Sequence, residues 1–166
     1  YLEGVGDSLD VVPIGAWYGK GKRTGVFGAF LVACYDPDEE AYQSLSKVAT
    51  GFSEADLDAA TKALQPHVIE APRVYYQYSK QILPDVWFDP ALVWEILCAD
   101  LSLSPRHQAA YGRVHEARGI ATRFPRFIRV REDKRPDMAT TAEQVADMYM
   151  NQDVIKANGN GGGHRR

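Results

Sequence analysis

Five runs of the chain are rich in β-branched and aromatic residues, and one helical pattern interrupts them between the third run and the fourth. The runs cover residues 9–18, 26–35, 42–50, 92–103 and 123–131. Glycine, proline and acidic residues separate them, which is typical of strands joined by turns. Pro13 lies inside the first run and predicts an edge or a bulge, because proline lacks the N–H that a strand ladder needs. We therefore expect an all-β domain with inserted helices.

Two helices are expected, each with a recognisable start. Ser53 is a good N-cap, with acidic residues in the turn that follows it, and this helix should stop near Pro66. Thr140 or Thr141 caps a last helix that is expected to run to about Met150. Because only the first helix falls between strands, the pattern is one of consecutive strands with a single insertion and a C-terminal addition.

Five strands with a helix between the third and fourth match the connectivity of an oligonucleotide-binding (OB) fold. The sequence thus predicts a five-stranded OB-fold barrel with a helix between strands 3 and 4 and a C-terminal helix, over residues 1–150. Residues 151–166 are predicted to form a flexible tail, since the chain becomes glycine-rich at its end. The chain starts at Tyr1 rather than methionine, and we expect it to be a piece of a longer protein.

The composition of the chain is that of a globular protein domain. At 166 residues, with 45% apolar and 25% charged residues, the chain has the make-up of one globular domain with a real core. No apolar run approaches the roughly 18 residues that a membrane span needs, so no membrane contact is expected. Cys34 and Cys98 sit in apolar runs and suggest buried thiols of a reducing compartment. The four histidines lack metal-ligand spacing, and no metal site is expected.

Basic residues concentrate near the C-terminal end of the chain. Of the 19 lysines and arginines, seven lie within residues 118–135, where arginines alternate with aromatic and β-branched residues. Such a strand presents a row of guanidinium groups, which grip phosphate oxygens with paired hydrogen bonds. Pro125 disfavours a helical Phe124, so Arg123 and Phe124 are expected to enter the strand extended and to project from it. The pattern favours an anionic partner over a merely solvated strand.

A second basic group lies in the glycine-rich loop of residues 19–25. It lacks the spacing of a phosphate-binding loop and joins two strands, yet its glycines allow the backbone to approach a partner whose phosphates the cations reach. The cations of this loop are Lys20, Lys22 and Arg23. Taken alone, Lys47 in the third run reads as a surface lysine. The acidic residues gather in other segments of the chain. This segregation of charge indicates one basic face and one acidic face, although the net charge is only −3.

The basic stretch ends on an Arg-x-Asp-Lys motif at Lys134, and five earlier segments carry further recognisable patterns: residues 1–10, 20–25, 47–52, 93–95 and 99–105. Together these segments resemble the eukaryotic ATP-dependent DNA ligases, with the closest likeness to their replicative branch. The likeness extends to about Met150. The resemblance implies the OB domain at the C-terminal end of a ligase catalytic core. The parent protein should seal nicks in duplex DNA during replication, repair and recombination, in the nucleus.

In that family a lysine of a Lys-x-Asp-Gly motif attacks ATP, and AMP then passes to the 5′ phosphate of a nick. The present chain contains no such motif, so the resemblance implies that this chain alone is inactive. The adenylated lysine, Mg²⁺ and most of the ATP site should lie in an upstream nucleotidyltransferase domain. The family assigns Arg131, Asp133 and Lys134 to the motif that covers the ATP β- and γ-phosphates during adenylation.

The resemblance also implies a second face that closes over the minor groove of nicked double-stranded DNA. Phosphate contacts on such a face position the duplex without reading its sequence. Phe124 would act as an apolar wedge against sugars and base edges. Matched to this face are Lys20, Lys22, Arg23, Lys47, Arg123 and Phe124. Further partners would be an upstream DNA-binding domain of the same protein and, far upstream, contacts to a sliding clamp.

Two other interpretations stay open at this stage. One is a binding-only OB module for single-stranded nucleic acid, with Tyr75, Tyr76 and Tyr78 as stacking platforms. The other is the related OB domain of an mRNA capping enzyme. The ligase interpretation predicts a preference for nicked duplex, whereas the binding-only interpretation predicts tighter binding to single strands and no need for ATP.

Overall fold

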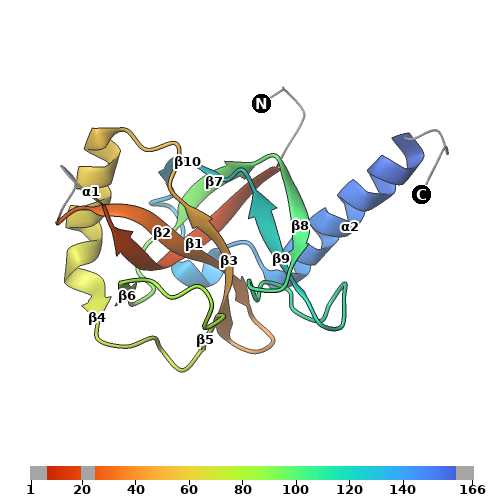
Figure 1. The fold of residues 1–166 in the computed structure, drawn as a ribbon, viewed down its shortest axis with the longest axis horizontal. Helices are drawn as coiled ribbons and strands as arrows, with labels where there is room; N and C mark the ends of the chain where they lie inside the picture. The colour runs from red at the N-terminus through yellow and green to blue at the C-terminus, as the bar shows by residue number, and fades with distance from the viewer. Residues whose placement is uncertain (1–6, 20–24, 160–166) are drawn as a thin grey trace.

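The computed structural model describes residues 7–19 and 25–159. Its main feature is an eight-stranded sheet that curls into a half-barrel, in the order β10-β7-β1-β2-β3-β5, with β6 joined to β1 and β4 (Figure 1). Strands β8 and β9 form a second sheet. The strands are β1 (Asp7–Tyr18), β2 (Phe27–Asp36), β3 (Ala41–Val48), β4 (Val68–Ile69), β5 (Tyr76–Gln77), β6 (Val86–Phe88), β7 (Trp94–Cys98), β8 (Asp100–Ser104), β9 (Gly119–Arg123) and β10 (Arg126–Val130).

The first three expected strands are confirmed and form an antiparallel meander. Strand β1 lies in the middle of the sheet, between β7 and β2. Its pairing with β2 shifts register between Pro13 and Gly15, which is the irregularity that proline predicts. The acidic turn that follows Asp36 joins β2 to β3, with Glu40 at a φ of 52°. The local sequence thus specifies this part of the fold well.

An aromatic cluster fills the interior of the half-barrel and connects the meander with the late strands. The rings of Phe30 and Trp94 meet edge to face at a centroid distance of 4.8 Å. Phe52 stacks on Phe127 at 4.5 Å. Because Phe127 is buried and comes from β10, this cluster holds β10 to the core.

The expected fourth strand is two strands in the structure. The chain bends at Ala99, so β7 stays in the main sheet while β8 leaves it and pairs with β9. The smaller sheet reaches β3 through a hydrogen bond that the Thr122 hydroxyl donates to Ser46 Oγ at 2.6 Å. A count of five strands is therefore too low for the described residues, although the mostly β architecture is confirmed.

The expected fifth strand is broken at Phe124, which is a correction to the sequence prediction. Phe124 has a φ of 54°, in the left-handed region, rather than the extended backbone expected before proline. Pro125 does disfavour the right-handed helical region, and the chain meets that constraint with a left-handed turn instead. The turn ends β9 and starts β10, which therefore belong to different sheets.

Helix α1 (Glu54–Leu64) follows β3 as predicted. The Ser53 hydroxyl accepts a bond from the Asp56 N–H, and the Asp56 carboxylate accepts one from the Ser53 N–H. A short 3₁₀ helix, η2 (Gln65–His67), continues it, and a second one, η3 (Pro136–Met138), precedes the last helix. Among the described residues, no helix is long and apolar enough to span a membrane.

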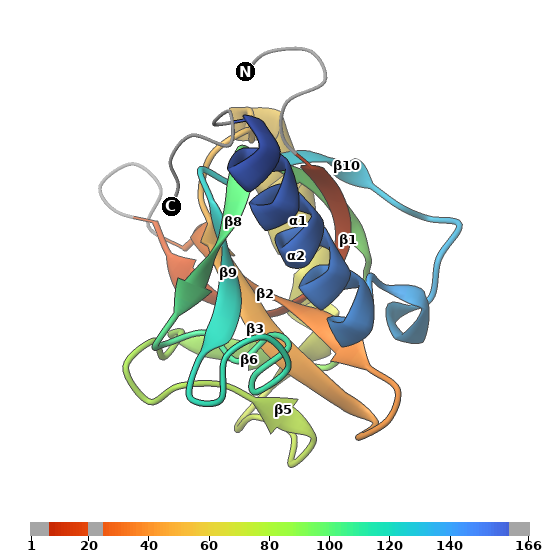
Figure 2. The ribbon, with the colours of Figure 1, turned by 90° about the vertical axis from the view of Figure 1, so that its right-hand side faces the viewer.

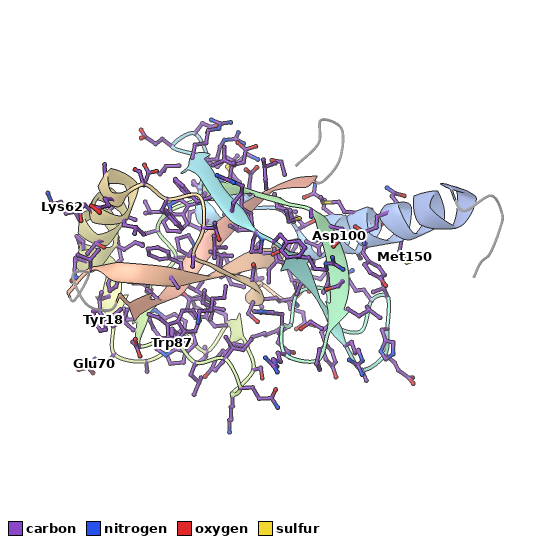
Figure 3. The ribbon with its side chains drawn as sticks, turned by 45° about the horizontal axis from the view of Figure 1, so that its top comes forward. Tyr18, Lys62, Glu70, Trp87, Asp100 and Met150 are labelled. Atoms are coloured by element: carbon purple, nitrogen blue, oxygen red, sulfur yellow. The ribbon has the colours of Figure 1, made fainter. Side chains whose placement is uncertain are left out.

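Helix α2 (Ala142–Gly159) packs across the two sheets, against β2, β8 and β9 (Figure 2). Thr141 is its capping residue, since its hydroxyl accepts a bond from the Gln144 N–H at 3.1 Å. The helix continues to Gly159, beyond the end expected near Met150 (labelled in Figure 3). The tail was predicted over residues 151–166; residues 151–159 belong to α2 instead, and residues 160–166 lie outside the described residues.

Candidate functional site

Arg131, which directly follows β10, lies at the centre of a charged network. Its Nε and Nη2 donate to the two carboxylate oxygens of Asp133 at 3.1 and 2.9 Å, a bidentate pair. Its Nη1 donates to Asp10 Oδ1 at 3.1 Å. The backbone N–H of Arg131 donates to the Val93 carbonyl at 2.7 Å, which ties the start of the loop to the main sheet.

Lys134 belongs to the same network through the same carboxylate. Its Nζ lies 2.6 Å from Asp10 Oδ2, and the turn is held by a hydrogen bond from the Lys134 N–H to the Arg131 carbonyl. The structure therefore brings the three predicted phosphate-site residues Arg131, Asp133 and Lys134 together. It adds Asp10, which sequence reasoning did not single out because it lies more than 120 positions earlier in the chain.

The charges of this network favour their ionised forms. The bidentate hydrogen bonds from Arg131 lower the pKa of Asp133 to about 2. The same bonds, with the nearby Asp10 charge, raise the pKa of Arg131 above its usual range. Both groups are thus charged at neutral pH, and the loop presents fixed positive groups beside fixed negative ones.

A polar cleft of about 420 Å³ opens next to Lys134, between β1 and α2. Asp10 and Lys134 reach it from one side, and Gln144 and Asn151 of α2 reach it from the other. Lys134 is the cation that lines this cleft, and it lies there beside the carboxylates of Asp10 and Asp147, so the lining carries charges of both signs.

A second candidate surface is a groove of about 520 Å³ at the break between β9 and β10. We call it the Phe124 groove, and it is lined by Lys47, Ala49, Thr50, Phe124, Pro125 and Arg126. The side chain of Phe124 is strongly exposed, at 74%, so it is not part of the core. An exposed aromatic ring flanked by cations is the combination that contacts sugars and phosphates of nucleic acid.

The cations around the Phe124 groove are held in place by their neighbours. Lys47 Nζ lies 4.3 Å from the centroid of the Trp17 ring. The Arg123 guanidinium lies 5.3 Å from the Phe124 ring centroid and forms an ion pair with Asp100 at 3.1 Å. The structure thus gathers three of the predicted DNA-face residues, Lys47, Arg123 and Phe124.

Three predicted residues of that face lie outside the described part of the chain, and four of the six groove residues were not predicted. Lys20, Lys22 and Arg23 lie outside the described residues. Thr50 and Arg126 line the groove without having been predicted as site residues. Arg126 carried a signal, since it lies in the arginine-rich stretch, whereas Thr50 joins the groove through tertiary structure alone.

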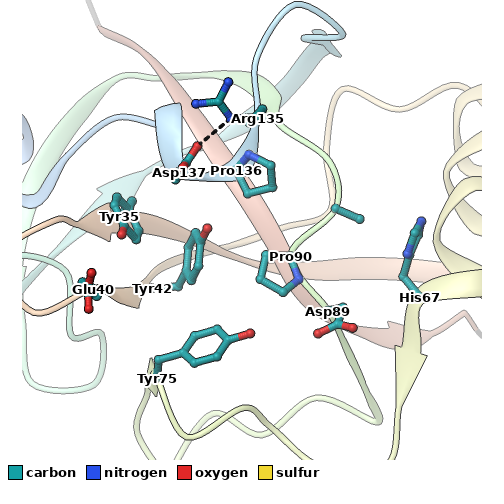
Figure 4. A pocket seen from close by; sticks show the side chains of 11 residues that line it. Tyr35, Glu40, Tyr42, His67, Tyr75, Asp89, Pro90, Arg135, Pro136 and Asp137 are labelled. Carbon is teal, nitrogen blue, oxygen red and sulfur yellow. Dashed lines mark hydrogen bonds and ion pairs between the residues drawn. The ribbon is translucent and has the colours of Figure 1, made fainter.

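The three tyrosines proposed as stacking platforms differ in their surroundings, and Tyr78 is half-buried with its ring centroid 4.7 Å from that of Trp87. Tyr76 is buried, and its hydroxyl donates to the Phe88 carbonyl, so it is a core residue. Tyr75 lines a hollow of about 750 Å³ together with Tyr35 and Tyr42 (Figure 4). Around these rings lie the carboxylates of Glu40, Asp89 and Asp137. Asp89 pairs with Arg73 and Asp137 pairs with Arg135, so the described lining of the hollow carries charges of both signs and lacks the positively charged groove that a single-strand site uses to follow the backbone.

Comparison with solved structures shows which fold this domain has. The structure is similar to the ligase domain of M. tuberculosis LigD, with a TM-score of 0.61 at 21% identity, over 81% of this chain and 38% of that chain. It is also similar to mycobacterial DNA ligase D complexed with ATP and MES, with a TM-score of 0.56 at 22% identity, over 82% and 38% of the two chains. These matches show the fold, an OB-type domain of the kind found in ligases.

Sequence comparison shows to which family the chain belongs. The family model described as "ATP dependent DNA ligase C terminal region" matches residues 23–134, and the chain belongs to that family. It is 57% identical to DNA ligase 1 of Dictyostelium discoideum over 93% of this chain, and 55% identical to DNA ligase 1 of Drosophila melanogaster over 95%. The chain spans 13% and 21% of the length of these two relatives.

Proposed function

We propose that this chain is the C-terminal OB domain of an ATP-dependent DNA ligase that seals nicks in duplex DNA. One observation carries the proposal: two sites that contain lysine or arginine side chains lie at opposite ends of one strand, and their chemistry differs. Strand β10 starts at the Phe124 groove, and the Arg131–Lys134 network follows its end. A sealing enzyme handles a triphosphate in one step and a duplex in another, which matches two such sites.

The Arg131–Lys134 network suits the triphosphate step. Its side chains offer N–H donors in fixed positions, and donors that need no reorganisation stabilise charge that develops on a leaving pyrophosphate. We assign Arg131, Asp133 and Lys134 to this step, in which a lysine of the same protein attacks ATP. ATP and Mg²⁺ would be bound mainly by an upstream nucleotidyltransferase domain, so this chain alone would form no covalent AMP adduct.

The Phe124 groove suits the duplex step. Lys47 and Arg123 would contact phosphates, while the exposed Phe124 ring would rest in the minor groove beside the nick. None of these contacts reads base sequence, as a general nick-sealing role requires. Replication, repair and recombination in the nucleus are the setting that we infer, together with an upstream DNA-binding domain and a sliding clamp as partners.

The proposal is tested by the binding preference of the full-length protein. Its Kd for a nicked duplex and for a single strand of the same sequence is measured across a range of salt concentrations. We expect tighter binding to the nicked duplex. Lys47→Ala should flatten the dependence of log K on log salt by about 0.9, the value of one phosphate contact on duplex DNA.

Lys62→Ala is the matched control for this experiment. Lys62 is an exposed lysine in the last turn of α1 that does not line the Phe124 groove (Figure 3). Its removal should leave the salt dependence unchanged. A preference for the single strand would instead support the binding-only OB module, and an equal effect of both substitutions would remove Lys47 from the duplex contact.

A further inference from the structure

Asp10 is the carboxylate on which both cations of the phosphate site converge. Arg131 Nη1 lies 3.1 Å from Oδ1 and 3.4 Å from Oδ2, and Lys134 Nζ lies 2.6 Å from Oδ2. The Asp10 side chain is 14% exposed, compared with 64% for Asp133. Asp10 is therefore the sheltered member of the network, and Asp133 is the one that faces solvent.

The backbone of Asp10 is fixed from both sides. Strand β7 pairs with it on one side, in a register that places Glu95 opposite Asp10. On the other side the Asp10 N–H donates to Thr140 Oγ1, and the Asp10 carbonyl accepts the Thr140 N–H, each at 2.9 Å. A carboxylate on such a backbone is a fixed reference point, whereas Arg131 and Lys134 are long and lie on a loop.

Both cations keep donors that their carboxylate partners do not use. A guanidinium has five N–H groups. Asp133 takes that of Nε and one of Nη2, and Asp10 contacts Nη1, which leaves the second N–H of Nη2. An ammonium has three, and Asp10 takes one from Lys134. A phosphate can therefore bind to the pair while Asp10 stays in place.

Without Asp10, the two cations would have no common anchor. Two like charges that share one carboxylate oxygen repel each other once that oxygen is removed, and long side chains gain rotamer freedom when they separate. We propose that Asp10 is a positioning residue that holds Arg131 and Lys134 together with their unused donors directed at the triphosphate. This inference rests on the proposed function of the same site.

Asp10 is not a catalytic residue in this account, because it touches the two cations and not the substrate. Its own charge opposes that of the phosphates, so the account depends on geometry outweighing that repulsion. The opposite balance would make Asp10 an inhibitory carboxylate that a phosphate displaces. The two possibilities predict changes of opposite sign when the Asp10 charge is removed.

The test is Asp10→Asn in the full-length protein, a change that keeps size and removes charge. We expect self-adenylation with ATP and Mg²⁺ to slow by about 10- to 100-fold, as small misplacements of positioning groups do. The Kd for inorganic pyrophosphate, measured by calorimetry, should rise in parallel. Sealing of a nicked duplex that is already adenylated bypasses the triphosphate and should change less than threefold, which a folding defect would not allow.

Glu95→Gln is the matched control, since Glu95 lies opposite Asp10 in the β1–β7 register and holds Arg129 at 2.8 Å. It should leave both the rate of self-adenylation and the Kd for pyrophosphate unchanged. Faster adenylation of Asp10→Asn, or a rate equal to wild type, would overturn the positioning role. If wild-type protein forms no lysine–AMP adduct at all, the proposed function fails; if Arg131→Ala slows adenylation but Asp10→Asn does not, only this inference fails.

Discussion

Phe124 is the residue whose sequence context and structure differ most. Its aromatic ring is strongly exposed, and its φ lies in the left-handed region that bulky residues seldom adopt. Strain of this kind persists where the surrounding structure enforces it and is frequent at binding sites. The neighbouring Arg123 guanidinium approaches the ring, so the two side chains form one exposed unit.

Replacement of Phe124 with alanine should impair nick sealing by the full-length protein without affecting its stability much. The ring buries little surface in the domain, so we expect the Tm to fall by less than about 2 °C. Self-adenylation should stay close to wild type. Single-turnover sealing of pre-adenylated nicks, combined with a thermal melt, measures both effects.

Phe127→Ala provides the contrast, because Phe127 is a core ring from the next strand. Its truncation should cost about 3–5 kcal/mol of unfolding free energy. If Phe124→Ala lowers the Tm as much as Phe127→Ala does, and sealing per folded molecule is unchanged, the wedge role is wrong.

His107 is a second residue with a measurable consequence, this time for stability. It is buried, and its Nδ1 lies 3.4 Å from Ser44 Oγ. Burial lowers its pKa to about 4, with a smaller contribution from the charge of Arg106. The unfolded chain binds a proton near pH 6.5, where the folded chain does not, so His107 stabilises the fold fully above pH 6.5 and progressively less as the pH falls toward 4.

We expect the unfolding free energy of the isolated chain in urea to fall by about 2 kcal/mol between pH 7 and pH 5 through His107. His107→Gln should remove that part of the pH dependence. His115→Gln, at an exposed histidine of the same loop, should leave it unchanged. An identical loss of stability between the two pH values in the His107 variant would show that other groups titrate there.

At the scale of elements, one side chain of α2 forms hydrogen bonds with the backbone of a strand in the smaller sheet. Gln152 accepts a hydrogen bond from the Leu101 N–H at 2.9 Å, and its amide nitrogen donates to the Leu101 carbonyl. Leu101 belongs to β8, whose edge would otherwise present these groups unpaired. The Gln152 amide therefore pairs with backbone groups on one edge of β8, while β9 pairs with its other edge.

Gln152→Ala should destabilise the domain by about 1–3 kcal/mol, because it leaves two backbone groups of a partly buried edge without partners. Asn151→Ala, at the exposed neighbouring position, is the control and should change stability by less than about 0.5 kcal/mol. Urea denaturation measures both values. Equal values for the two variants would mean that water replaces the Gln152 amide at no cost.

The elements that the sequence predicts best are those specified by local signals. The first three strands and the N-cap at Ser53 depend on neighbouring residues and were predicted from them, and of the edge or bulge expected at Pro13 the structure has the bulge. The bend at Ala99 and the break at Phe124 were not predicted, because both depend on which sheet the chain joins next. The continuation of α2 past Met150 depends on its contact with β8, which lies about 50 positions away.

The candidate site shows the same division between local and distant information. Arg131, Asp133 and Lys134 form a short motif, and Arg123 and Phe124 precede it in the same basic stretch. Asp10 and Thr50 join these residues only through the pairing of distant strands. Both residues lie in segments that resemble the ligase family, 1–10 and 47–52, but no chemical pattern within those segments marks either one as a site residue.

At the scale of the whole molecule, β10 separates the two cationic sites. Its five residues, at about 3.3 Å each, set the Phe124 groove and the Arg131–Lys134 network roughly 16 Å apart. One phosphate therefore cannot contact both sites, because they lie at opposite ends of the same strand. If both sites serve one active centre in turn, the entire domain has to change its orientation between the steps.

The most direct test of this account compares two variants on two substrates in the full-length protein. Lys134→Ala should slow self-adenylation with ATP by at least about 100-fold and sealing of pre-adenylated nicks by less than about threefold. Phe124→Ala should show the reverse pattern in the same two single-turnover assays. The account predicts this double dissociation, and an equal loss on both substrates for either variant would contradict the assignment of one site to each step.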